Sequence, residues 1–543
     1  MINTKEHLKP LTDLLIRTIS ETNGISLANT LELMMSSTEA RQDQRISNIL
    51  DSFIELIFNH RLKKITINEL LSHPFSKSLF SFFKLFPIKY HEEHVHLTGS
   101  LSPEFIHPRL MKLLDGANGG KIKKNLVEIY GPAAENINSP EDIEKLICLA
   151  KNQQFHDYLK ILYLPKLILT DRKTHFEAAH HMAQNLYENF NIGRIRLKFT
   201  LSRATNLKTE KIDGLENLSE EDVIMGLYEG FMSFKKEHPD FDFVLSPCFR
   251  KESNFFDSER FSSKKDHFEH QIDEISAILE KHPELVDYLR NIDTVGDEKS
   301  FFKKEHFMEM KHGLRRLQYK GFQIRGHHGE SWRTLSKGVQ SVDNAVNIWR
   351  IDALEHGISL GINPNYYFHG ITNEILRLNK NKSAIRDNTL EYNELMDLEW
   401  HDPLVRQKLL GGTPLNEKET TNFIKSKFHT AMETEQYQHD VLNHMINKDV
   451  ALIALPTSNL KLTGRFHYYK DHPFSWWEKK GVRLGIGTDN YVTLGTNYIK
   501  ELLTLLYSDP EDLKITKLLI VGTREKRRPY ISNLLWKMRK NLA

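Results

Sequence analysis

The sequence predicts an α/β fold, a closed (β/α)8 TIM barrel with a helical extension before its first strand and a long insertion after its sixth. The 543 residues exceed one ordinary domain and suit one large core with additions. Eight short apolar segments follow residue 85, and helix-period stretches separate most of them. This alternation is expected of a parallel sheet with covering helices, and eight such units favour a closed barrel over an open sheet.

Residues 1–85 are predicted to be helical throughout. Apolar residues recur there at three- and four-residue spacing, as at Ile46, Ile49, Leu50, Phe53 and Ile54, which places them on one helix face. We interpret this segment as a helical extension that packs on the core. A role in oligomerisation or regulation stays open. The barrel is expected to occupy residues 86–543.

The predicted strands are short apolar runs that alternate with helical or turn-forming sequence. They are Phe86–Leu97, Ile195–Leu201, Phe241–Leu245, Leu289–Val295, Phe322–His327, Asp352–His356, Val450–Leu455 and Val482–Thr488. The gaps after the first and sixth strands are longer than a simple unit needs, so both must carry extra structure. Residues 363–434, in the second gap, predict an ordered insertion at the face where barrel loops shape substrate sites.

Composition and charge exclude several classes of protein. The 74 Lys and Arg residues against 72 Asp and Glu leave a net charge of +2, so no strong field recruits a nucleic-acid polymer or an anionic membrane. No run approaches the ~18 apolar residues of a membrane span, and the first residues lack a signal-peptide core. We therefore expect a cytoplasmic protein. Two cysteines, Cys148 and Cys248, can form neither a disulfide framework nor a thiolate zinc site.

Two histidine motifs end predicted strands. The first strand ends in HEEHVHLTGS, where His94 and His96 share one face and can point to one metal ion. The fifth ends in IRGHHGESW, where His327 can ligate a metal and Glu330 can reach a substrate proton. His328 should point the other way, into a second layer or a loop. Each motif alone also fits a chance H-x-H pair or a polar surface turn.

His356 and Asp489 end the sixth and eighth predicted strands. A lone histidine is often a satisfied structural residue, and an aspartate at a strand end can cap the next helix. The combination is more specific than its parts. Three histidines and one aspartate fall at the C-terminal ends of the first, fifth and eighth strands, and closing the barrel makes the first and eighth neighbours. Imidazole and carboxylate ligands without thiolate suit a catalytic zinc with an open position for water.

These motifs resemble those of the adenosine deaminase family of zinc-dependent purine deaminases, from about Pro87 to Asn490. The family's H-x-H-L, H-x-G-E, H-G and T-D-D segments are matched in order at residues 94–97, 327–330, 356–357 and 488–490. IDTVGDE at 292–298 and LPTSNL at 455–460 look like its fourth- and seventh-strand signatures. The resemblance implies a hydrolase acting on C–N bonds of cyclic amidines. Its substrate would be an adenosine- or AMP-like 6-aminopurine, converted to the 6-oxopurine with release of ammonia.

The resemblance also implies roles for individual residues. One Zn²⁺ per subunit would be held by four side chains, namely His94, His96, His327 and Asp489. Glu330 would donate a proton to purine N1, and His356 would orient and help deprotonate the attacking water. The implied catalytic residues are therefore Glu330, His356 and Asp489.

The implied substrate contacts are His96, Thr98, Gly296 and Asn490, of which the Gly296 N–H would bind purine N3. Two of them depart from the usual family pattern. Adenosine-specific members have Asp at the position of Thr98, where it meets the ribose 5′-hydroxyl. A carboxylate would repel a 5′-phosphate and a hydroxyl would not, so we expect a 5′-phosphorylated substrate. Asn490 replaces the second Asp of T-D-D, and its amide can donate to purine N7.

Two other functions stay open. One is a non-catalytic purine-binding or regulatory protein on the deaminase fold, and the other is a different mononuclear zinc amidohydrolase. A two-metal site bridged by a modified lysine in the fourth strand is disfavoured, because residues 292–295 contain no lysine. We expect a small purine nucleoside or nucleotide as partner, and neither a nucleic-acid polymer nor a membrane. Homo-oligomerisation is left open.

Overall fold

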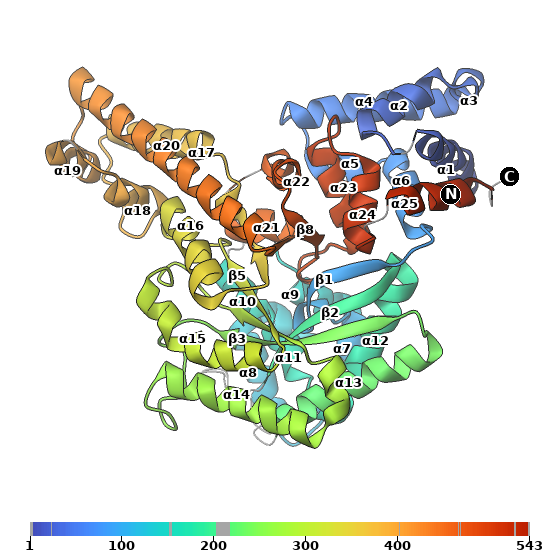
Figure 1. The fold of residues 1–543 in the computed structure, drawn as a ribbon, viewed down its shortest axis with the longest axis horizontal. Helices are drawn as coiled ribbons and strands as arrows, with labels where there is room; N and C mark the ends of the chain where they lie inside the picture. Colours follow the sequence, from blue (N-terminus) through green and yellow to red (C-terminus); the bar gives the residue numbers. More distant parts are fainter. Residues whose placement is uncertain are drawn as a thin grey trace.

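A computed structural model of the chain describes residues 4–22, 24–150, 155–201, 218–400, 402–464, 466, 468–525 and 528–540. Eight parallel strands follow one another in the sheet in the order of the chain (Figure 1). They are β1 (Tyr90–His96), β2 (Ile192–Thr200), β3 (Asp242–Arg250), β4 (Asn291–Val295), β5 (Gln323–His328), β6 (Ala353–His356), β7 (Ala451–Ala454) and β8 (Arg483–Ile486). Each predicted strand overlaps one of these, so the predicted TIM barrel is confirmed.

The barrel closes between its first and last strands, just beyond the end of β8. Val95 forms a parallel bridge with Asp489. The His96 N–H donates to the Asp489 carbonyl at 2.8 Å, and the Asp489 N–H donates to the His94 carbonyl at 2.9 Å. The seam of the barrel therefore runs through three of the predicted metal ligands.

Helices account for the long first gap and cover the barrel strands. Between β1 and β2 lie α7 (Pro103–Leu114), α8 (Gly119–Tyr130), α9 (Pro140–Ile147), α10 (Phe155–Ile161), α11 (Tyr163–Leu167) and α12 (Arg172–Phe190). The next four strands are followed in turn by α13 (Glu220–Glu237), α14 (Lys264–Lys281), α15 (Lys304–Tyr319) and α16 (Leu335–Asn344). After β7 come α21 (Pro456–Thr463) and α22 (Phe474–Lys479). None of the helices in the described residues is both long and apolar enough to cross a bilayer.

Helix α14 shows how the sequence builds a covering helix. It begins after Ser263, whose side chain accepts a backbone N–H of the first turn, as an N-cap residue does. Phe268, Ile272 and Ile275 recur at three- and four-residue spacing and are fully buried. Phe268 on that face packs edge-on against Phe249 of β3, with ring centroids 5.2 Å apart, and so fixes α14 against the barrel.

The N-terminal helices pack on the C-terminal ones. The first group is α1 (Thr4–Glu21), α2 (Leu27–Ser36), α3 (Thr38–Gln42), α4 (Gln44–Arg61), α5 (Ile67–Ser72) and α6 (Pro74–Lys84), and the second is α23 (Tyr498–Ser508), α24 (Ile515–Thr523) and α25 (Arg528–Lys540). Helix α1 lies beside α25 (Figure 1), and Arg539 near the end of α25 pairs with Glu21 at the end of α1 at 3.0 Å. Ser76 Oγ and Tyr507 Oη share a buried hydrogen bond of 2.5 Å. The predicted apolar face of α4 is narrower than expected, because Ile54 remains exposed while Phe53 is buried.

The insertion after β6 consists of helices and their connections. It comprises α17 (Pro364–Lys380), α18 (Leu390–Asp397), α19 (Pro403–Gly411) and α20 (Glu417–Asn447). Helices α17 and α20 run side by side and project away from the strands (Figure 1). The Gln438 side chain fixes α20 to the barrel, since its Nε2 donates to the carbonyls of Ser359 at 2.8 Å and Ile362 at 2.9 Å.

Candidate metal and catalytic site

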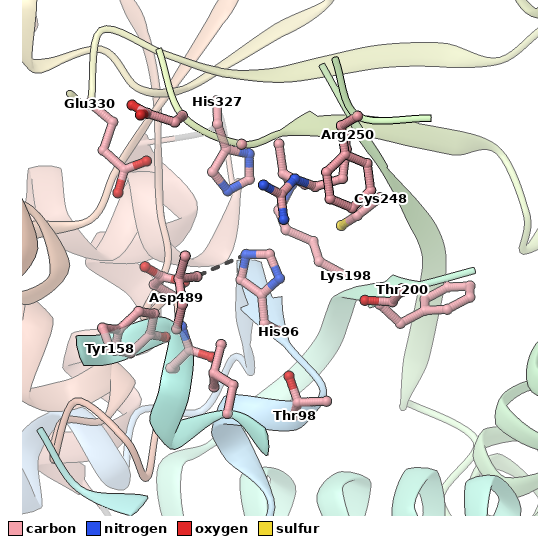
Figure 2. A pocket seen from close by; sticks show the side chains of 18 of the residues that line it. His96, Thr98, Tyr158, Lys198, Thr200, Cys248, Arg250, His327, Glu330 and Asp489 are labelled. Atoms are coloured by element: carbon pink, nitrogen blue, oxygen red, sulfur yellow. Dashed lines mark hydrogen bonds and ion pairs between the residues drawn. The ribbon is translucent and has the colours of Figure 1, made fainter. Parts of the chain in front are cut away.

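The predicted metal ligands converge at the C-terminal face of the barrel. Ring nitrogens of His94, His96 and His327 all lie within 4.8 Å of one another. The Nε2 atoms of His94 and His96 are 3.2 Å apart. Asp489 Oδ1 lies 3.5 Å from His96 Nε2 and 3.8 Å from His94 Nε2, and Figure 2 shows the Asp489 and His96 side chains meeting. Three imidazoles and a carboxylate, with no thiolate, form a donor set that fits a catalytic divalent ion such as zinc.

Two buried carboxylates orient the histidine rings. His94 Nδ1–H donates to Glu355 Oε2 at 2.7 Å, and His327 Nδ1–H donates to Asp293 Oδ1 at 3.2 Å. Each bond holds one ring nitrogen, so the Nε2 atom is left for the centre of the site. Burial, together with the nearby Lys198, keeps the pKa of His94 well below its usual value. His94 is therefore neutral, which is the form that can ligate a metal.

Lys198 joins these two carboxylates beneath the histidines. Its Nζ donates to Glu355 Oε1 at 3.0 Å and also pairs with Asp293. Burial alone would raise the pKa of Glu355, but Arg325 and Lys198 lower it to about 2. Burial would also raise the pKa of Asp293, but His327 and Lys198 lower it well below its usual value. Both carboxylates are thus ionised, with the buried cations Lys198 and Arg325 beside them, which is the condition under which buried charges are tolerated. Lys198, Asp293 and Glu355 were not identified from the sequence, and each of them is a charged residue inside an apolar strand segment.

Glu330 and His356 lie close together over the site. Glu330 Oε2 is 3.6 Å from His356 Nε2. Burial raises the pKa of Glu330, so the protonated acid is favoured. Burial and the neighbouring His327 lower the pKa of His356 to about 4, so its ring is neutral near pH 7.

Asn459 selects the tautomer of His356. The His356 Nδ1–H donates to Asn459 Oδ1 at 2.8 Å, which leaves the Nε2 lone pair free to accept a proton. That Nε2 has no hydrogen-bond partner in the part of the chain that the structure describes. One acid and one base therefore face each other. Asn459 belongs to the LPTSNL segment that was predicted only as a strand-end signature.

Two site residues adopt a backbone conformation that is unusual for residues other than glycine. His356 has φ 68° and Asp489 has φ 65°. Left-handed conformations of such residues cost energy and cluster at functional sites, where the surrounding structure holds them in place. Asp489 is held by Ser458, whose Oγ donates to Oδ2 at 2.5 Å, and by Asn490, whose Nδ2 donates to Oδ1 at 2.6 Å. The Asn490 oxygen packs against Gly99, where a Cβ would lie 1.7 Å away.

A single cavity joins the predicted catalytic residues to the predicted substrate contacts. It is lined by His96, Thr98, Gly296, His327, Glu330, His356, Asp489 and Asn490, among others. His94 is fully buried below it. Gly296 has φ 120°, and a Cβ there would lie 2.2 Å from Glu252 Oε2, so only glycine fits. The same Glu252 accepts the Asp297 N–H at 2.9 Å and so fixes the turn that carries Gly296.

The chain is similar to several solved structures at low sequence identity. No protein-family profile and no curated protein sequence matches the chain. Among solved structures it is similar to adenine deaminase from Arthrobacter aurescens, with 13% identity, TM-score 0.49, and coverage of 83% of this chain and 99% of that one. It is also similar to N6-methyl-AMP deaminase from Arabidopsis thaliana, with 12% identity, TM-score 0.47, and coverage of 84% and 96%.

A third similar structure is an amidohydrolase from Burkholderia ambifaria with bound Zn, at 11% identity and TM-score 0.47, with coverage of 85% of this chain and 94% of that one. Identities this low assign neither a substrate nor a metal to this chain. The strand pairing described above identifies the fold as a barrel, and the distances between the side chains identify the candidate site.

Proposed function

We propose that this protein is a zinc-dependent hydrolase that deaminates a 6-aminopurine nucleoside or nucleotide to the 6-oxopurine and ammonia. The observation that carries the proposal is the convergence of His94, His96, His327 and Asp489 on one point of a cavity that Glu330 and His356 also line. The order and spacing of the motifs, which resemble the adenosine deaminase family, support the same chemistry.

The residues present fit one zinc ion. His94, His96, His327 and Asp489 would hold it, with Glu355 and Asp293 fixing two of the rings. A zinc ion bound there supplies the Lewis acidity that makes a water molecule nucleophilic near neutral pH.

Glu330 and His356 would carry the protons of the reaction. His356 Nε2 accepts a proton from the attacking water as the new C–O bond forms at purine C6. Glu330, whose pKa is raised by burial, would donate a proton to N1, so the electrons displaced into the ring do not leave a negative charge on N1. The amino nitrogen leaves as ammonia after receiving the proton from His356. The C6 hydroxyl then gives its proton to Glu330 as the carbonyl forms, and N1 keeps the proton that it received. Their 3.6 Å separation supports this division of roles, because two groups so close can reach the adjacent atoms N1 and C6 of one ring.

The cavity wall would recognise the rest of the substrate. The Gly296 N–H would donate a hydrogen bond to purine N3, because Gly296 lines the cavity and Glu252 holds the adjoining turn. Thr98 lines the same cavity and offers a neutral hydroxyl to the 5′ position. A small phosphorylated purine is the substrate that these contacts support best.

A substrate panel tests the proposal. Purified protein with measured zinc content is offered adenosine, deoxyadenosine, AMP, ATP and N6-methyl-AMP, and loss of the 6-amino group is followed by absorbance. We expect one zinc per chain and turnover of at least one purine. The Glu330→Gln variant should keep its zinc and lose about 10²- to 10⁴-fold in kcat. Wild-type turnover in that variant would refute the assigned proton donor, and tight purine binding without turnover by the wild type would show a non-catalytic binding protein.

A further inference from the structure

One wall of the cavity is cationic. It is formed by the end of β3 and the first turns of α14, and Arg250, Lys264 and His267 line it. On α14 the lining residues Lys264, His267 and Gln271 stand three and four positions apart, so they share one helix face. We call Arg250, Lys264 and His267 the basic wall.

Lys264 is the unusual member of the basic wall. Its side chain is buried, with only 4% of the residue exposed, yet among the described residues no carboxylate oxygen lies within 4.0 Å of its Nζ. The Nζ donates to the Phe255 carbonyl at 3.0 Å, which uses one of its three donors. Burial lowers the pKa of Lys264 to about 8, an effect that Glu252 and Glu309 oppose and Arg250 reinforces. A buried ammonium without a carboxylate in direct contact is costly, so its place beside a cavity needs a reason.

The other two members of the basic wall do not neutralise Lys264. Arg250 is already paired with Glu252 through contacts of 3.1 and 2.5 Å, and its guanidinium lies 4.3 Å from the Phe255 ring centroid. His267 Nδ1 accepts the Asp257 N–H at 3.3 Å, so the neutral ring carries its proton on Nε2 and can donate it. The wall therefore offers an ammonium that no carboxylate of the described residues contacts, and a neutral ring donor.

The basic wall lies where the 5′ end of a bound nucleotide is expected. Figure 2 shows Glu330 and Asp489 on one side of His96, and Thr200, Cys248 and Arg250 on the other. A purine whose C6 and N1 face the first side must extend its sugar towards the second. Asp297 also lines the cavity, but its Oδ1 already accepts the Lys299 N–H at 3.0 Å.

We propose that the basic wall binds the 5′-phosphate of the substrate, with Lys264 supplying the charge and His267 Nε2–H a second hydrogen bond. This assignment rests on the proposed deaminase function, and it names the residues that would select a nucleotide over a nucleoside. A phosphate dianion would give the buried Lys264 ammonium an anion in direct contact. A charge-assisted hydrogen bond between an ammonium and a phosphate is stronger than a hydrogen bond between neutral groups.

Substrate discrimination by a Lys264→Met variant tests the assignment. The matched control is Lys265→Met, because Lys265 is the next residue on α14, has 56% of its side chain exposed and does not line the cavity. In zinc-loaded protein, Lys264→Met should lower kcat/KM for AMP by about 10- to 100-fold and leave adenosine within about threefold. Lys265→Met should change neither, and Lys264→Arg should retain most of the preference for AMP. Equal losses on both substrates, or no loss on AMP, would overturn the assignment.

A binding measurement separates this inference from the proposed function. If the wild type deaminates adenosine as efficiently as AMP, the proposed deaminase function is supported and the proposed phosphate site is refuted. If it deaminates no purine, calorimetric titration with AMP, adenosine and inorganic phosphate still decides the matter. Tighter binding of AMP than of adenosine, lost in Lys264→Met and kept in Lys265→Met, supports the site without catalysis. Equal binding of AMP and adenosine by the wild type overturns it.

Discussion

Replacing Lys264 with Met should make the protein more stable at pH 7. Lys264 is a buried cation whose pKa falls from its usual 10.5 to about 8 in the folded chain. Because folding lowers the pKa of this cation, the protonated side chain opposes folding. The cost is complete below pH 8, decreases between pH 8 and 10.5, and vanishes above that range. Methionine has a similar length and carries no charge, so it removes the cost without emptying the space.

The size of the effect follows from the two pKa values. A pKa lowered from 10.5 to about 8 corresponds to roughly 3 kcal/mol at pH 7. Unfolding a chain of 543 residues carries an entropy of about 1.1 kcal/mol per kelvin, so the variant should gain about 2–3 °C in Tm. At pH 9.5 the same two values leave about 1.4 kcal/mol, or about 1 °C.

Differential scanning calorimetry of the wild type, Lys264→Met and Lys265→Met at pH 7 and 9.5 measures this gain. All scans must use the same heating rate, because a protein of this size can unfold irreversibly and its apparent Tm then depends on that rate. The exposed Lys265 should show no gain at either pH. A loss of stability in Lys264→Met, or a gain that does not shrink as the pH rises, would refute the reasoning that a charge without a carboxylate in direct contact is buried beside the cavity.

Three further results are expected. Glu355→Gln should weaken zinc binding by about 10- to 100-fold in a chelator competition, since it disturbs the bond to His94 Nδ1; unchanged affinity would mean that Glu355 does not support the ligand. Glu330→Gln should bind zinc normally in the same competition, and a parallel loss of zinc would show that its effect on turnover is indirect. Gly296→Ala should lower both Tm and kcat/KM, because its Cβ would collide with Glu252 at 2.2 Å; wild-type values in both would show that the turn can shift.

The fold could be predicted because alternating strands and helices leave a periodic signal in the sequence. The ends of the strands were less predictable. The eighth was expected to run to Thr488 but ends at Ile486, where the chain turns towards the left-handed Asp489. The predicted metal ligands lie together because each ends a parallel strand, and parallel strands present those ends at one face.

The carboxylates and the lysine beneath the site could not be found in this way. Lys198, Asp293 and Glu355 lie on β2, β4 and β6, far apart in sequence. Inward side chains of alternate strands share one layer of a barrel, so they meet only after the barrel has closed. In the sequence each one interrupts an apolar run, and nothing local identifies its partners. Lys264 was not identified for a different reason: a lysine in a helix usually faces solvent, and nothing in the sequence marks this one as buried.

The candidate metal site spans the seam between β1 and the segment after β8, so it is complete only after the last strand has docked. His94 and His96 lie on one side of the seam and Asp489 on the other, joined by backbone hydrogen bonds of 2.8 and 2.9 Å. A chain that has not yet docked its last strand lacks one predicted ligand and the neighbour that positions the other two. An ion held by all four would act as a clasp between the first and last strands. Loading with metal would then report that the barrel has been assembled correctly, and loss of metal would loosen the barrel first at this seam.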